Sequence, residues 1–73
     1  MSALSRTFPK SLYVLPAVNE AIQVYEGLAT MTLERSDDAW TVIFTETDAD
    51  FEPEVIASEF ANYVLAETIN RRR

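Results

Sequence analysis

Hydrophobic and polar residues follow two different periods along this chain. Three stretches alternate with a period of two, which is typical of half-buried strands, and two longer stretches repeat apolar residues every three or four positions, which is typical of amphipathic helices. The alternating stretches cover residues 3–8, 29–35 and 40–47. The helical stretches begin near residue 15 and near residue 51. The predicted order is therefore strand, helix, strand, strand, helix.

The first strand is expected from Ala3 to Phe8. Leu4 and Phe8 are its large apolar residues, and Arg6 lies between them. Pro9 follows directly, and proline has no N–H to donate to a strand ladder. We therefore expect the strand to end at Pro9 or to lie at an edge of the sheet.

The first helix is expected to begin at Leu15 or Pro16, because proline suits the first helical position. Its apolar residues recur at helical spacing and share one face. They are Val18, Ala21, Ile22, Tyr25 and Leu28. Gly27 is the only glycine in the chain, and it stands where many helices end in a left-handed residue. The sequence thus predicts a helix stop with a positive φ at Gly27.

Two strands joined by a short acidic turn should form a hairpin. In the stretch 29–35, Ala29, Met31 and Leu33 share one face. Asp37 and Asp38 lie in the turn, where aspartate bonds its own backbone. The next strand carries Trp40, Val42 and Phe44 on its inner face. The opposite face of both strands is mostly threonine: Thr30, Thr32, Glu34, Thr41, Ile43 and Thr45. We expect water, or a lightly held partner, to cover that face.

The last stretch, 51–73, is expected to form one long amphipathic helix. Pro53 suits its first position, and the acidic residues Glu52 and Glu54 suit the positive end of the helix dipole. The predicted core stripe consists of Ile56, Phe60, Tyr63, Val64 and Thr68. Three further apolar residues lie outside this stripe: Val55, Leu65 and Ile69. Excess apolar surface of this kind either wraps the margin of the core or marks a contact with a partner.

These elements predict a single α+β domain over residues 1–73. The expected architecture has two layers in β-α-β-β-α order: a three-stranded sheet with both helices on one face and the first strand beside the third. It resembles a ferredoxin-like fold that stops before its final strand. The free edge of the first strand would then present unpaired N–H and C=O groups to another chain.

Composition narrows the function further. Twelve acidic and six basic residues among 73 give a net charge of −6, which argues against a nucleic-acid partner. No window reaches the ~20 apolar residues of a membrane span, and the N-terminus lacks the apolar core of a signal peptide. We therefore expect a cytoplasmic protein.

The sequence offers little for catalysis. It has no histidine and no cysteine, so the commonest general base, the strongest nucleophile and the usual zinc ligands are missing. A single glycine excludes a glycine-rich phosphate loop. We expect no enzymatic activity, no cofactor and no metal. A weaker alternative is a cation-dependent regulatory domain that uses the acidic residues between Asp48 and Glu54.

Candidate partner-binding residues lie in three places. Leu4, Arg6 and Phe8 belong to the strand with the expected free edge. Trp40 opens a strand beside a turn, and tryptophan is enriched at binding hot spots. Leu65 and Ile69 extend the apolar surface of the last helix beyond its core stripe.

A family resemblance adds to this interpretation. Residues 4 to 71 resemble the small D protein of the His-Xaa-Ser peptide-modification system, HxsD. The resemblance runs from Ser11-Leu12-Tyr13 through Ala21 and Tyr25 to the last helix. Its most specific part is Phe60-Ala61-Asn62, which is similar to the family's Phe-x-Asn segment, and it adds Asn62 to the candidate binding residues. Tyr63 and Ala66 depart from the family's pattern, which has acidic residues there.

The resemblance implies an accessory protein that works beside a radical S-adenosylmethionine enzyme and a ribosomally made precursor peptide. The chain would then bind the maturase, the precursor peptide, or both, without performing the radical step. The absence of cysteine agrees with this role, because an iron–sulfur cluster needs cysteine ligands. An alternative of another class is a structural homodimer whose paired edges complete one continuous sheet.

Overall fold

A computed structural model describes residues 4–72 of the chain. It contains three strands and two helices in the order predicted from the sequence. The elements are β1 (Leu4–Pro9), α1 (Leu15–Tyr25), β2 (Ala29–Arg35), β3 (Ala39–Thr47) and α2 (Pro53–Arg71). The predicted ends of the first strand at Ala3 and of the last helix at Arg73 lie outside the described residues.

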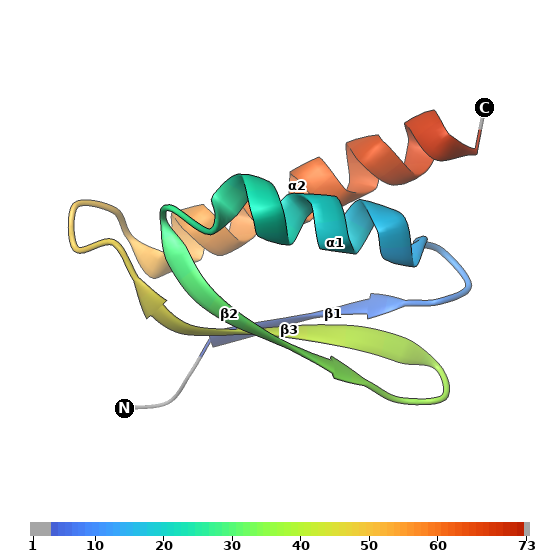
Figure 1. The fold of residues 1–73 in the computed structure, drawn as a ribbon, viewed down its shortest axis with the longest axis horizontal. Helices are drawn as coiled ribbons and strands as arrows, with labels where there is room; N and C mark the ends of the chain where they lie inside the picture. The colour runs from blue at the N-terminus through green and yellow to red at the C-terminus, as the bar shows by residue number, and fades with distance from the viewer. Residues whose placement is uncertain (1–3, 73) are drawn as a thin grey trace.

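The three strands form one antiparallel sheet in the order β1-β3-β2. The first strand therefore lies beside the third, as predicted. Both helices pack on the same face of the sheet, side by side, and the opposite face carries no helix (Figure 1). This is the predicted two-layer α+β architecture.

The hydrophobic core lies between the helix layer and the sheet. Phe60 of α2 is fully buried, and its ring meets Phe8 of β1 and Phe44 of β3 at centroid distances of 5.9 and 5.3 Å. Tyr25 of α1 also meets this ring, at 5.8 Å. Burying one such side chain is worth about 1.5–3 kcal/mol. Phe60 therefore joins four of the five elements, because α1, α2, β1 and β3 all contribute to its surroundings.

The predicted helix faces match the buried residues closely. Val18 and Ala21 of α1 are buried, and Ile22, Tyr25 and Leu28 pack against the core. In α2, the predicted stripe is buried except for Tyr63, which is half-buried. The short side chains of Ala17 in α1 and Ala57 in α2 are also fully buried in the core.

The other face of the sheet is open and rich in hydroxyl groups. Thr30, Thr32 and Glu34 of β2 are exposed, and Ile43 of β3 is half-buried. Thr7 and Thr41 bring their hydroxyl oxygens within 3.2 Å of each other across β1 and β3. The register of β2 against β3 shifts at Thr30 and Met31, which leaves Thr45 as an extra residue in β3.

The end of α1 differs from the sequence prediction. Gly27 does not have a positive φ, and no described residue does. The helix instead ends at Tyr25 in a tight turn with ordinary backbone angles, in which the Leu28 N–H donates to the Tyr25 carbonyl at 2.9 Å. The prediction of a left-handed glycine was therefore wrong, because an αR turn can end a helix without one.

Neither helix described here combines the length and the hydropathy that a membrane span requires.

Candidate partner-binding surface

The outer edge of β1 is open within residues 4–72, because β1 is a terminal strand of the sheet. The Lys10 N–H donates to the Asp38 carbonyl at 2.8 Å, which fixes a hydrogen-bonded pair at the end of the β1–β3 ladder. Hydrogen-bonded and non-hydrogen-bonded pairs alternate along an antiparallel ladder. Leu4, Arg6 and Phe8 therefore direct their backbone groups toward β3. Ser5 and Thr7 direct theirs away from the sheet.

Two contacts limit what this edge offers. The Arg6 guanidinium donates to the Ser5 carbonyl at 3.1 Å, so this outward acceptor already has one donor. Pro9 has no N–H, and its carbonyl accepts from Leu12 and Tyr13 at 3.1 and 3.0 Å. The groups left for another strand are the two N–H groups of Ser5 and Thr7, the Thr7 carbonyl and the second lone pair of the Ser5 carbonyl.

One side of α2 borders this edge. Arg6 donates to the carboxylate of Glu54 at 2.9 Å, which places Glu54 on the β1 side of α2. An α-helix turns 100° per residue, so Ser58, Ala61 and Leu65 follow Glu54 along the same side. Leu65 is 46% exposed, and Ala61 is half-buried. The β1 edge and this flank of α2 together form what we call the β1–α2 surface, defined by Ser5, Thr7, Glu54, Ser58, Ala61 and Leu65.

The structure divides the candidate residues of β1 by their burial. The Phe8 ring is buried in the core and contacts Tyr13 and Phe60, so it is not available to a partner. Leu4 is half-buried against the core, and Arg6 is held between Glu54 and the Ser5 carbonyl. The residues that face outward through their backbone, Ser5 and Thr7, were missing from the predicted set.

The candidate residues of α2 are all exposed. Asn62, Leu65 and Ile69 lie on the side of the helix that is turned away from the core, and Ile69 is 51% exposed. Leu65 belongs to the β1–α2 surface, while Asn62 and Ile69 are rotated about 80° and 60° further around the helix from Glu54.

Trp40 lies apart from these residues. It pairs with Phe8 in β1 and with Arg35 in β2, and its half-buried ring packs against the core. The Lys10 ammonium lies 5.5 Å from the centre of the ring, in a cation–π contact. Trp40 therefore closes one end of the core, and its position does not add to the β1–α2 surface.

A second open edge, which the sequence did not suggest, follows β2. The Ser36 N–H donates to the Ala39 carbonyl at 3.0 Å, so Ser36 and Ala39 form a hydrogen-bonded pair. Because hydrogen-bonded and non-hydrogen-bonded pairs alternate along the hairpin, the backbone groups of Met31, Leu33 and Arg35 point away from β3. Met31 and Leu33 also place half-buried side chains over the core. This edge could have been found from the sequence by asking which strand of the hairpin has no second neighbour.

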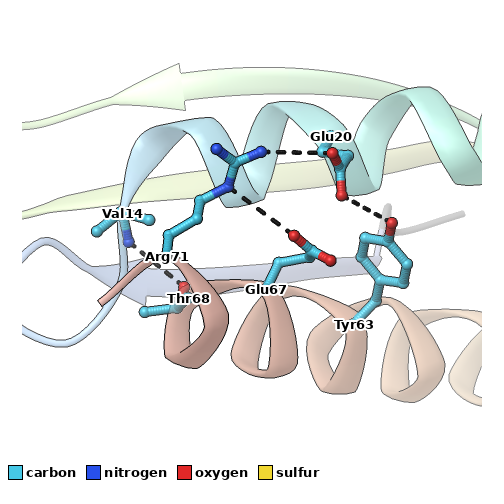
Figure 2. A network of polar contacts seen from close by, with 6 residues as sticks. All are labelled: Val14, Glu20, Tyr63, Glu67, Thr68 and Arg71. Carbon is cyan, nitrogen blue, oxygen red and sulfur yellow. Dashed lines mark hydrogen bonds and ion pairs between the residues drawn. The ribbon is translucent and has the colours of Figure 1, made fainter. Parts of the chain in front are cut away.

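The two helices are joined by a polar network. Figure 2 shows the Tyr63 hydroxyl directed at Glu20, to which it donates at 2.8 Å. The guanidinium of Arg71 contacts Glu20 at 3.3 Å and Glu67 at 3.9 Å. The Val14 N–H, at the start of α1, donates to the Thr68 hydroxyl at 3.5 Å. This network fastens the C-terminal half of α2 to α1.

Two tyrosine pKa values rise because of these surroundings. The hydrogen bond to the carboxylate of Glu20 raises the pKa of Tyr63 above its ordinary value, and burial adds to the rise. Burial raises the pKa of Tyr25, and the nearby negative charge of Glu59 acts in the same direction. Both phenols are therefore neutral at physiological pH and act as hydrogen-bond donors or packing groups.

Within residues 4–72, no three Asp or Glu side chains lie together in an arrangement that could hold a metal ion. Asp48 instead accepts from the Asp50 backbone N–H at 2.9 Å, which is the turn-forming role of a loop aspartate.

Comparison with known proteins yields no matching family model, no matching curated protein and no matching solved structure.

Proposed function

We propose that this chain is a non-catalytic binding protein that accepts an extended segment of a protein partner along the open edge of β1. The observation that carries the proposal is the outward direction of the Ser5 and Thr7 backbone groups beside an exposed flank of α2. Strand addition of this kind supplies main-chain hydrogen bonds for affinity and neighbouring side chains for specificity.

The partners that we propose are a radical S-adenosylmethionine maturase and its ribosomally made precursor peptide, in the cytoplasm. This part of the proposal is supported by the resemblance of residues 4–71 to HxsD proteins. Within the Phe60-Ala61-Asn62 segment, Phe60 supports the core and Asn62 faces solvent, which is the arrangement expected of one structural and one contact residue. A chain without cysteine leaves the iron–sulfur chemistry to its partner.

A homodimer is the second candidate, and a specific observation favours it. Both outer strands of the sheet, β1 and β2, have open edges within the described residues, and edges of this kind readily pair with a second copy. In this case the chain would build a continuous sheet and have no dedicated ligand.

Calorimetry tests the binding proposal directly. The chain is titrated with the radical enzyme and with the precursor peptide encoded beside its gene, and we expect a complex with at least one of them at micromolar concentration. The variant Thr7→Pro should abolish binding while keeping the fold, because the Thr7 N–H points away from β3 and takes no part in the ladder.

The contrary outcomes are well defined. A gene without a radical enzyme beside it contradicts the maturation role, and an intact complex in Thr7→Pro contradicts the use of the β1 edge. A dimer in sedimentation experiments that dissociates in Thr7→Pro would favour the homodimer instead. Ser5→Pro removes the other outward N–H, near the start of β1. It replaces Thr7→Pro as the test variant if Thr7→Pro does not fold.

A further inference from the structure

We infer that the segment accepted by the β1 edge is a basic peptide strand and that a second copy of this chain does not occupy this site. The inference rests on the proposed function and adds the chemistry of the partner. It follows from the side chains that flank the edge, from the distribution of charge along the sheet and from the consequences of pairing two copies.

The side chains on the two faces beside the β1 edge favour a partner strand in which polar and apolar residues alternate. On the open face of the sheet, an added strand would lie beside the hydroxyl groups of Ser5 and Thr7, which suit small or polar side chains. On the helix side we expect it to face the flank of α2 that begins at Glu54, on which Ala61 and Leu65 are the apolar residues and would suit apolar side chains. Because successive residues of a strand point to opposite faces, the partner needs apolar residues at every second position.

The charge around the start of β1 is strongly negative. Leu4 pairs with Phe44, so β3 continues past the start of β1 toward the loop that leads to α2. The segment from residue 46 to residue 54 contains five acidic residues and no basic one. They are Glu46, Asp48, Asp50, Glu52 and Glu54, and all but the half-buried Asp48 are exposed. Arg6, which contacts Glu54, neutralises only one of these charges.

This charge favours a basic partner in two ways. Lysine or arginine at the end of the added strand nearest Glu54 would form ion pairs at the rim of the contact, each of which contributes modestly. The acidic field would also raise the rate of encounter with a basic segment, and this effect weakens as salt is added.

A second copy fits the same edge poorly. The two-fold pairing that uses every outward backbone group sets Ser5 of one copy opposite Thr7 of the other, with Arg6 of both copies facing each other on the axis. Like charges directly opposite in neighbouring strands are destabilising. The contact between Arg6 and Glu54 then brings the acidic N-terminal ends of both α2 helices close to the axis as well.

Other two-fold registers lose hydrogen bonds. A pairing centred on Thr7 sets Ser5 opposite Pro9 of the other copy, which has no N–H and whose carbonyl is already bound by Leu12 and Tyr13. A pairing centred on Ser5 leaves Thr7 without a partner among the described residues. Among the registers whose paired residues all lie within residues 4–72, the self-pairing that satisfies the backbone is therefore the one that opposes like charges.

Fluorescence anisotropy with three short labelled peptides tests the inference. In the first, valine alternates with lysine; the second has threonine in place of lysine, and the third has glutamate. We expect the lysine peptide to bind at least tenfold more tightly than the glutamate peptide at low salt, with the difference shrinking as salt rises.

Two double variants locate the interaction on the chain. Glu52→Gln with Glu54→Gln removes two charges at the start of α2, of which Glu54 contacts Arg6 of β1, and should weaken the lysine peptide about threefold to tenfold. The matched control, Asp37→Asn with Asp38→Asn, removes two charges from the hairpin turn at the other end of β3 and should leave the affinity within a factor of two. Sedimentation of the unmodified chain should show no dimer that Thr7→Pro dissociates.

The results separate this inference from the proposed function. Equal binding of all three peptides, or equal effects of the two double variants, overturns the basic partner and leaves strand addition standing. Failure of all three peptides, together with failure of the radical enzyme and its precursor, overturns both. A dimer that Thr7→Pro dissociates overturns the exclusion of a second copy. Amide shifts at Ser5 and Thr7 on peptide addition provide a readout that needs no variant.

Discussion

The two sides of α2 show how differently one helix can be used. On the side that faces the core, Phe60 and Val64 are completely enclosed, and Thr68 is buried with its hydroxyl bonded to Val14. On the side that borders the edge of β1, Leu65 is 46% exposed and Glu54 extends into solvent beside Arg6. The side chains on the first side are buried by the chain itself, and those on the second side remain exposed.

This difference separates residues that hold the fold from residues that are free to serve a partner. A domain of 73 residues has a small core, so its stability depends on a few enclosed side chains. Changes on the enclosed side of α2 should therefore act on folding, and changes on the β1 side should act on binding with little effect on folding.

The largest expected effect is at Phe60. Phe60→Ala would empty the centre of the core between Phe8, Phe44 and Tyr25, and we expect a loss of about 3–5 kcal/mol, which is most of the stability of a small domain. Leu65→Ala on the other side of the helix should cost less than about 1 kcal/mol. Urea denaturation of both variants measures the contrast, and similar losses would contradict the division of α2 into two sides.

Much of the fold could be predicted because local patterns and tertiary contacts agree. The alternation in residues 29–35 gave β2 its observed ends, and Pro16 and Pro53 placed the starts of both helices. The apolar period of α2 separated the buried Ile56 from the exposed Leu65 and Ile69 correctly. Gly27 failed as a signal because glycine permits a left-handed turn without requiring one.

The candidate site was less predictable because it depends on register and on distant pairs. Whether Arg6 or Thr7 turns its backbone outward is fixed by the bond between Lys10 and Asp38, and shifting the register by one residue reverses the answer. The contacts of Glu20 with Tyr63 and Arg71 join residues 43 and 51 positions apart, which no local spacing reveals. The sequence could predict that a strand edge is open, but it could not predict which backbone N–H and C=O groups point outward from that edge.

The next largest effect is expected at Thr68. Thr68→Val keeps the shape of the side chain but removes the hydroxyl that accepts from the Val14 N–H, and α1 has no side-chain cap to replace it. We expect a loss of about 1 kcal/mol in the free energy of unfolding. Thr68→Ser is the matched control because it keeps the hydroxyl and removes only a methyl group. If Val is tolerated better than Ser, the enclosed side of α2 relies on packing alone.

A smaller effect, dependent on pH, is expected at Tyr63, which lies at the edge of the enclosed side of α2 where this helix contacts α1. The folded pKa of Tyr63 is raised above the ordinary value of 10.0, mainly by the hydrogen bond to Glu20. The stabilisation is therefore fully present below that value and is lost as the pH rises through the folded pKa. Tyr63→Phe should be less stable than the parent at pH 7, and the difference should shrink in alkali. A gap that widens above pH 10 would contradict this.

The smallest effect is expected at Gly27, which lies in the turn after α1, outside both sides of α2. A methyl group added at Gly27 would meet no atom within 4 Å, and the backbone has ordinary angles there. Gly27→Ala should therefore raise stability by about 0.5 kcal/mol, because alanine restricts the unfolded chain and loses nothing in the folded one. Gly27→Asn is the control, since asparagine tolerates a left-handed backbone better than alanine does. Thermal denaturation that ranks Asn above Ala, with Ala below glycine, would show that the turn is left-handed in solution and would restore the expectation drawn from the sequence.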